Sequence, residues 1–151
     1  PETGLRVHDV EEFKERSRSD ANILIAEDSA LLSSLITDCL KKAGYGNLIV
    51  TTNGQEAWDQ LVKFKKEGDP AEKVQCIITD IEMPQMDGHR LTKLVKSDDK
   101  LKNIPVVIFS SLVNEEMRRK GESLGADAQL TKPEIGSLVE AIDELIAKKN
   151  Q

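Results

Sequence analysis

The chain has 151 residues, a length that suits one compact domain and is too short for two. Hydrophobic residues make up 38% and charged residues 32% of the sequence, a balance that is ordinary for a globular protein and argues against wholesale disorder. The formal net charge of −6 opposes attraction to nucleic acid, and no stretch approaches the roughly 20 apolar residues of a membrane span. We therefore expect neither nucleic acid nor a membrane among the partners.

Two apolar patterns alternate along the chain. Short apolar runs, typical of strands buried on both faces, occupy residues 22–26, 48–51, 75–79, 104–109 and 128–131. Segments with helical spacing of apolar residues follow them, at residues 32–40, 55–65, 89–96, 115–124 and 135–146. Gly44 and Gly125 are placed to end two of these helices. The order predicts an α/β fold with a doubly wound, five-stranded parallel sheet and helices on both faces.

The two cysteines, Cys39 and Cys76, lie in apolar stretches and have neither the spacing of a metal site nor that of a CxxC motif. Buried, reduced thiols are therefore expected. The start of the sequence has no apolar run of the signal-peptide type. Together these features predict a cytoplasmic location.

Residues suited to phosphoryl transfer follow four of the predicted strands. Glu27 and Asp28 come after the first strand, Asp80 after the third, Ser110 after the fourth and Lys132 after the fifth. In an open parallel sheet the carboxyl ends of the strands share one edge, where ligands bind. We therefore expect these five side chains to converge.

Carboxylates gathered in this way need a cation, because unit charges about 4 Å apart repel by about 4 kcal/mol at an effective dielectric constant near 20. Oxygen ligands favour Mg²⁺. Phosphoryl transfer to a carboxylate needs the same parts: an oxygen nucleophile, a metal, and a cation and hydroxyl for the phosphoryl oxygens. Taken singly, Glu27 and Asp28 are explained by helix capping and Lys132 by a solvated charge. Their joint placement favours a site.

The strings ILIAEDSALL, IITDIEMPQMDG, VVIFSS and GADAQLTKP, in this order, resemble the hallmark blocks of CheY-like response regulator receiver domains. The resemblance covers residues 22–148. It implies a flavodoxin-like, three-layer fold and a signalling role in a bacterial two-component system. In that role Asp80 accepts a phosphoryl group from a histidine kinase and switches a partner-binding surface, without acting as a turnover enzyme.

The resemblance also implies roles for the neighbours of Asp80. Asp28, Asp80 and the backbone carbonyl of Glu82 would bind Mg²⁺, with Glu27 assisting through a water molecule. Ser110 and Lys132 would contact the phosphoryl group. The peptide bond between Lys132 and Pro133 would be cis, an option specific to proline.

Residues 107–135, VIFSSLVNEEMRRKGESLGADAQLTKPEI, resemble the receiver domains of CheV-type chemotaxis coupling proteins. The polar segment 65–73 is similar to an insertion in that group, and we expect residues 63–73 to form a solvated loop. Residues 1–20 would then be the end of an interdomain linker and residues 21–149 the receiver domain. A CheA-like kinase would be the phosphoryl donor, and a CheW-like domain outside this chain would connect it to the chemoreceptor array.

Three other functions remain open at this point. One is a stand-alone CheY-like regulator, or the receiver of another two-component pathway. A haloacid-dehalogenase-type phosphatase also uses an aspartyl nucleophile and Mg²⁺, but it needs D-x-D after the first strand. Here the candidate nucleophile, Asp80, ends the third strand and is followed by Ile81-Glu82, which disfavours a hydrolase. A flavodoxin-like cofactor binder is disfavoured by an aromatic content of only 3%.

Several other residues carry simpler expectations. His8 and His89 do not end a strand and are expected at the surface, whereas Trp58 lies on an apolar helix stripe and is expected in the core. Gln129 occupies the position, three residues before the lysine, where many receivers have an aromatic switch residue. We expect it to be available for a polar contact with a partner, on a face formed by residues 115–124, the last strand and the last helix.

Overall fold

Five parallel strands form one sheet in the order β2-β1-β3-β4-β5. The computed structural model describes residues 18–111, 114–132 and 135–149. The strands are β1 (Asn22–Ala26), β2 (Asn47–Thr51), β3 (Cys76–Thr79), β4 (Val106–Ser110) and β5 (Ala128–Thr131). The helices are α2 (Ala30–Ala43), α3 (Gly54–Glu67), α4 (Pro70–Lys73), α5 (Gly88–Lys96), α6 (Glu115–Leu124) and α7 (Ile135–Lys149). This is the doubly wound α/β fold that the alternating pattern predicted.

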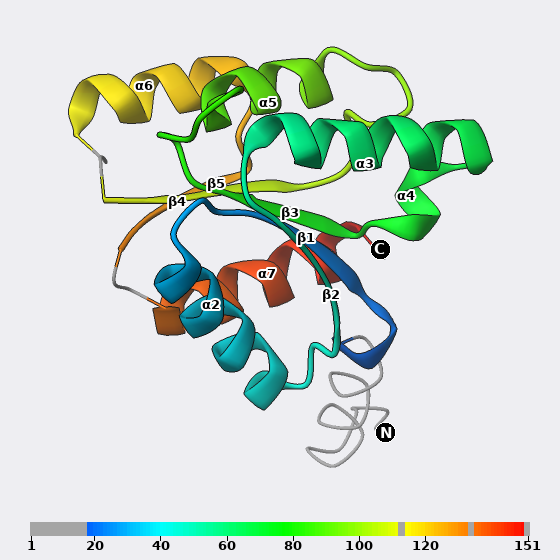
Figure 1. Cartoon of the computed structure of the whole chain (residues 1–151), viewed down its shortest axis with the longest axis horizontal. Coiled ribbons are helices and arrows are strands. Elements are labelled where there is room, and N and C mark those ends of the chain that lie inside the picture. Colours follow the sequence, from blue (N-terminus) through cyan, green and yellow to red (C-terminus); the bar gives the residue numbers. More distant parts are fainter. Residues whose placement is uncertain (1–17, 112–113, 133–134, 150–151) are drawn as a thin grey trace, which may run out of the picture.

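Helices cover both faces of the sheet, with α2 and α7 on one side and α3, α5 and α6 on the other (Figure 1). Side chains alternate between the two faces along each strand, so β1 contributes Ile23 and Ile25 to one core and Leu24 and Ala26 to the other. Trp58 packs against the second core while remaining partly exposed. The sheet is thus the shared wall of two apolar cores, which holds the strand ends in fixed positions.

Burial on both faces is confirmed for the inner strands and wrong for the outer two. All residues of β3 and β4 are buried, whereas β2 and β5 contain partly exposed residues. In β2, for example, 49% of Val50 is accessible. The reason is the strand order, which puts β2 and β5 at the edges of the sheet. Neither cysteine forms a disulfide with another described residue; Cys76 in β3 is buried and Cys39 in α2 is half-buried.

The expected solvated loop at residues 63–73 is helical instead. Helix α3 continues to Glu67, and α4 begins after the N-cap Asp69, whose carboxylate accepts a hydrogen bond from the Ala71 amide. Pro70 occupies the first turn of α4, where a proline needs no amide hydrogen and its fixed φ is favourable. The polar composition of this segment therefore reflects an exposed helix end and a short extra helix.

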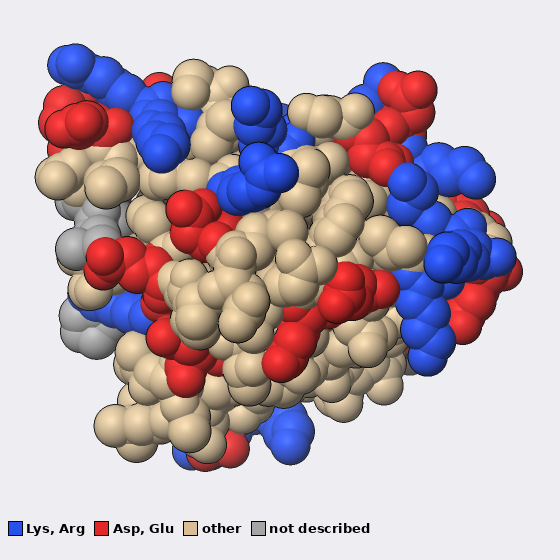
Figure 2. All heavy atoms as spheres, turned by 45° about the horizontal axis from the view of Figure 1, so that its top comes forward, with Lys and Arg blue, Asp and Glu red and all other residues tan. Residues whose placement is uncertain are grey.

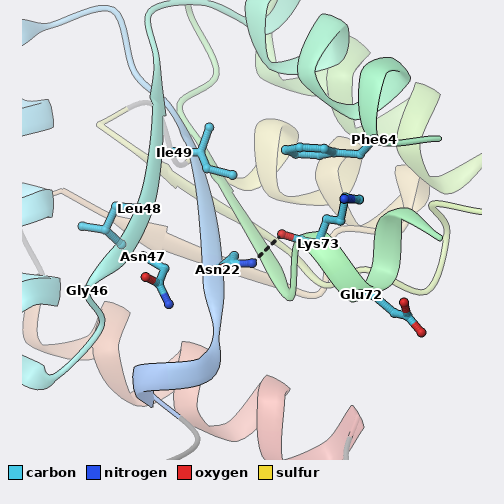
Figure 3. A pocket seen from close by; sticks show the side chains of 8 residues that line it. All are labelled: Asn22, Gly46, Asn47, Leu48, Ile49, Phe64, Glu72 and Lys73. Atoms are coloured by element: carbon cyan, nitrogen blue, oxygen red, sulfur yellow. Dashed lines mark hydrogen bonds between the residues drawn. The ribbon is translucent and has the colours of Figure 1, made fainter. Parts of the chain in front are cut away.

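Helix α4 also forms one wall of a hollow of about 550 Å³ beside the outer edge of β2 (Figure 3). Phe64 and Ile49 line the hollow, and the ammonium of Lys73 lies 6.0 Å from the centre of the Phe64 ring. The Asn22 side chain donates a hydrogen bond of 2.9 Å to the Lys73 carbonyl. The hollow lies at the amino ends of β1 and β2, opposite the edge where the predicted site residues follow their strands.

Residues 18–20 are helical and packed on the domain. The guanidinium of Arg18 donates to both carboxylate oxygens of Asp143 in α7, at 3.1 and 2.6 Å, and to the Ala43 carbonyl at 2.8 Å. The buried Tyr45 hydroxyl donates to the same carboxylate at 2.5 Å, and burial raises the pKa of Tyr45. This network fixes where the chain enters the domain. His8 lies outside the described residues.

His89 is buried, contrary to the expectation of a surface position. It is the second residue of α5 and only 3% of it is accessible, because α6 packs against α5. Burial lowers the pKa of the His89 imidazole below its usual 6.5, the positive charge of Lys120 lowers it further, and Asp87 opposes both effects.

This pKa gives a test of the packing. The unfolded chain binds a proton near pH 6.5 while folded His89 resists it, so the stability contributed by neutral His89 is complete above pH 6.5 and is lost as pH falls through the folded pKa. We expect His89→Gln to lose less stability between pH 7 and pH 5 than the wild type, measured by urea unfolding. Parallel curves for the two proteins would contradict this burial.

Candidate functional site

The strand register brings the predicted site residues to one edge of the sheet. Ala26 pairs with Thr79, so Glu27 and Asp80 follow neighbouring strands at the same level. Ser110 pairs with Thr131, which puts Lys132 one residue beyond the level of Ser110. The amide of Lys132 donates to the Ser110 carbonyl at 3.1 Å, and the amide of Asp80 donates to the Ala26 carbonyl at 3.0 Å.

Lys132 lies between two of the carboxylates. Its ammonium is 2.7 Å from Oε1 of Glu27 and 3.2 Å from Oδ2 of Asp80. The three side chains are nearly enclosed, with 9% of Lys132, 2% of Glu27 and 11% of Asp80 accessible. The low exposure strengthens each charge interaction relative to a surface pair. The other oxygen of Asp80, Oδ1, accepts a hydrogen bond of 2.8 Å from the Ile81 amide.

Glu27 is the most buried acid of the site. Burial raises the pKa of its carboxyl group, and the hydrogen bonds from Lys132 and from the Ser29 amide oppose that rise. The Ser29 amide donates to Oε2 of Glu27 at 3.1 Å, while the Ser29 hydroxyl caps α2 by accepting from the Leu32 amide. Ser29, in the turn after β1, therefore both fixes Glu27 and caps the start of α2.

Asp28 completes an acidic cluster and is itself exposed. Carboxylate oxygens of Glu27, Asp28 and Asp80 all lie within 4.8 Å of one another. The single ammonium of Lys132 leaves this group of three carboxylates with two excess negative charges. Two charges and an all-oxygen donor set fit a hard divalent cation, because Mg²⁺ binds through one or two carboxylates and keeps several waters. Receiver domains bind Mg²⁺ in an acidic pocket of this type.

Ser110 is buried at the end of β4. The side chain of Glu82 is exposed, two residues after Asp80. The coordination by the Glu82 carbonyl and the water bridge from Glu27 stay predictions. The predicted cis bond between Lys132 and Pro133 involves a residue outside the described ones.

Gly88 contributes to the site in a way that the sequence analysis missed. A Cβ atom at this position would lie 1.8 Å from the carbonyl oxygen of Asp80, so the start of α5 packs directly against the backbone of the predicted acceptor. The Gly88 amide donates to the Ile81 carbonyl at 2.8 Å, and Gln85 turns the loop with a φ of 71°. The usable signal was Asp87-Gly88, an N-cap followed by a residue without a side chain.

Gly88→Ala is therefore expected to destabilise the fold, although alanine normally favours a helix. The clash is with backbone, which cannot move aside as a flexible side chain would, and overpacking of this kind costs about 1–3 kcal/mol. Gly136→Ala in α7 is the matched control, since a Cβ there meets nothing within 4 Å. Its unfolding free energy should be unchanged or higher. Equal values for both variants in urea unfolding would disprove the close approach.

The family model of the response regulator receiver domain matches residues 23–143. The chain belongs to the response regulator receiver domain family. Its fold is the CheY-like form of the flavodoxin-like fold, and receiver domains are signalling domains that take phosphoryl groups from histidine kinases. Among the described residues, no helix has both the length and the apolar character needed to cross a membrane.

Chemotaxis proteins are among the relatives. The chain is 34% identical to the sensor histidine kinase CheAY of Helicobacter pylori, over 83% of this chain and 15% of that protein. It is 28% and 33% identical to the chemotaxis proteins CheV3 and CheV2 of the same organism, over 88% of this chain and 43% and 41% of theirs. The chain thus spans less than half the length of these relatives, and other receivers, including CheY proteins, are equally similar.

Solved structures agree with this assignment. The receiver domain of a signal transduction histidine kinase from Syntrophus aciditrophicus is 30% identical and superposes with a TM-score of 0.71. The match covers 85% of this chain and 91% of that domain. The predicted fold class is therefore confirmed. The family match favours a receiver domain over a phosphatase or a flavin-binding protein.

Proposed function

We propose that this receiver takes a phosphoryl group on Asp80 from a CheA-type histidine kinase and serves in chemotaxis as part of a CheV-type coupling protein. The observation that carries the proposal is the position of Asp80 beside Lys132, 3.2 Å away, within the cluster that also contains Glu27 and Asp28. These are the parts that phosphoryl transfer to a carboxylate requires.

In the proposed reaction a carboxylate oxygen of Asp80 attacks the phosphorus of the kinase phosphohistidine. The new bond is P–O, the P–N bond breaks, and the imidazole leaves with its electron pair and takes a proton. Lys132 stabilises charge on the phosphoryl oxygens, and the Ser110 hydroxyl donates to another of them. The amide of Ile81 holds the Oδ1 oxygen of Asp80, which leaves Oδ2 on the side of Lys132.

Asp28, Asp80 and the backbone carbonyl of Glu82 would hold Mg²⁺, with Glu27 assisting through water. When bound, the ion supplies positive charge next to the transferring phosphoryl group. A second role proposed for Glu27 is to position Lys132, which is supported by the 2.7 Å ion pair between its carboxylate and the ammonium that also lies 3.2 Å from Asp80. On this proposal the domain is phosphorylated once for each signal and does not turn over a substrate.

The CheV assignment rests on similarity to CheV2 and CheV3 over most of this chain. Residues 21–149 would form the receiver and residues 1–20 the end of an interdomain linker, in which Arg18 is already held by Asp143. A CheW-like domain would join the protein to the chemoreceptor array. Cys39 and Cys76 are not joined in a disulfide, which is consistent with the proposed cytoplasmic location. A stand-alone CheY-like regulator is the second candidate, favoured by the equal similarity of CheY proteins.

Phosphotransfer from a kinase tests the proposal. A purified CheA-type kinase from the same source is labelled on its histidine, freed of ATP and mixed with this chain and Mg²⁺. We expect the label to move to the chain within seconds to minutes. Chelation of the metal before mixing should prevent this transfer. Label that stays on the kinase would reject the CheA-type partner. A CheW-like domain encoded upstream of residue 1 would separate the coupling protein from the stand-alone regulator.

A further inference from the structure

A cleft of about 260 Å³ lies between α5 and α6, on the side of the sheet opposite α2 and α7. It is lined by Asp87, His89, Arg90, Lys93, Lys120 and Leu124. Three of these side chains are cationic and one is anionic, if His89 is neutral. The cleft is therefore locally positive in a chain whose formal net charge is −6.

The cations of the cleft have no partner among the residues that the structure describes. Within residues 18–111, 114–132 and 135–149, the side chains of Arg90, Lys93 and Lys120 have no ion pair or hydrogen bond. By contrast, Lys96 in the same helix pairs with Asp127 at 2.7 Å. Figure 2 shows Lys and Arg side chains along the upper part of this face, with Asp and Glu side chains among them.

His89 supplies an independent observation. Its Nε2 atom is buried and is the one buried side-chain nitrogen or oxygen in the described part of the chain that lacks a hydrogen-bond partner. A buried polar atom without a hydrogen bond destabilises the folded chain, so a ligand that supplied a partner would be favoured there. The exposed side chain of Lys120, on α6, lines the same cleft as His89. A ligand oxygen that displaced it could reach the imidazole.

From these observations we infer that the α5/α6 cleft binds an acidic peptide segment of a partner protein. Arg90 and Lys93 stand one turn apart on α5, and Lys120 lines the cleft from α6, so the positive charges are spread over both walls of the cleft. Carboxylates spaced along a peptide match this arrangement better than one small anion in a closed pocket. The amino end of α5 adds a favourable partial charge. The site is separate from the acidic cluster around Asp80.

The probe is an acetylated and amidated octaglutamate peptide, titrated at low ionic strength and followed by NMR of the His89 ring and of the α5 and α6 amides. We expect saturable shifts at these positions. Affinity should fall at least about tenfold in the triple variant R90A/K93A/K120A, in which only exposed side chains change. The matched control K41A/K42A/K148A removes three other exposed cations and should bind within about twofold of the wild type.

His89→Phe provides a second arm, because it keeps an aromatic ring and removes both nitrogens. Its affinity for the peptide should fall severalfold, while its thermal midpoint should be unchanged or higher. The inference is overturned if both triple variants weaken binding equally, since general charge attraction would then explain it. The inference is also overturned if the peptide causes no shift of the His89 ring signals. It is overturned as well if inorganic phosphate binds the same residues as tightly as the peptide, because that result is expected of a small-anion site.

Discussion

Lys132→Met should lower the rate at which acetyl phosphate phosphorylates the chain by about 10²–10³. This range is the loss seen when one preorganised donor to a developing charge is removed from an active site. The ammonium lies 2.7 Å from Glu27 and 3.2 Å from Asp80, and only 9% of its side chain is accessible, so water cannot replace it well. Methionine keeps the length of the side chain and removes the charge.

The same substitution leaves the buried carboxylates of Glu27 and Asp80 without their cation. Breaking a buried pair by removing one partner costs about 3–5 kcal/mol, so the variant should also be less stable in the absence of divalent ions. Mg²⁺ should stabilise it more than it stabilises the wild type, because the ion then meets an unneutralised cluster. Lys148→Met, on the exposed end of α7, is the control for both measurements. If acetyl phosphate phosphorylates Lys132→Met at the wild-type rate, the role of this lysine is refuted.

Asp28→Asn is expected to weaken Mg²⁺ binding by more than about tenfold, measured by calorimetry. The cluster holds three carboxylates, and the most buried of them, Glu27, is engaged by Lys132 and the Ser29 amide. Asp28 is the exposed member and the one able to bind an incoming ion directly with Asp80. Asparagine keeps the shape of the aspartate side chain and removes one unit of negative charge.

Glu82→Ala is the matched control for the metal site. It also removes one carboxylate near Asp80, but its side chain is exposed, and the proposed ligand is its backbone carbonyl. Mg²⁺ affinity should therefore stay within about threefold of the wild type. A loss equal to that of Asp28→Asn would mean that general negative charge, rather than the cluster of Glu27, Asp28 and Asp80, attracts the ion.

The fold and the convergence of the site residues were predictable because they depend on local patterns and one topological rule. Runs such as Asn22–Ala26 alternate with helical spacing, and parallel strands bring their carboxyl ends to one edge. The position of Glu27, Asp80 and Lys132 follows from those two facts alone. The contact between Gly88 and the Asp80 carbonyl does not, because it depends on the angle at which α5 leaves its loop.

The wrong expectation for His89 concerns tertiary packing. His89 lies in a polar stretch, yet α6 covers it, and no pattern within α5 indicates which neighbour lies above that helix. Gln129 is half-buried, and its side-chain amide donates to the Arg118 carbonyl at 2.8 Å, while its expected contact with a partner stays a prediction. It lies across Gly121, where a Cβ would come within 2.2 Å of its side-chain oxygen. The fit between β5 and α6 combines Gln129 with Gly121 and Arg118, and neither segment alone reveals these pairings.

The most direct test of the central claim is the intact mass of the protein after incubation with Mg²⁺ and acetyl phosphate, followed by peptide mapping. Asp80 is the acid held beside Lys132, at 3.2 Å, so the account predicts a single phosphoryl adduct located on Asp80 and no adduct on Asp80→Asn. An adduct formed in equal yield on Asp80→Asn would contradict the assignment of Asp80 as the phosphoryl acceptor.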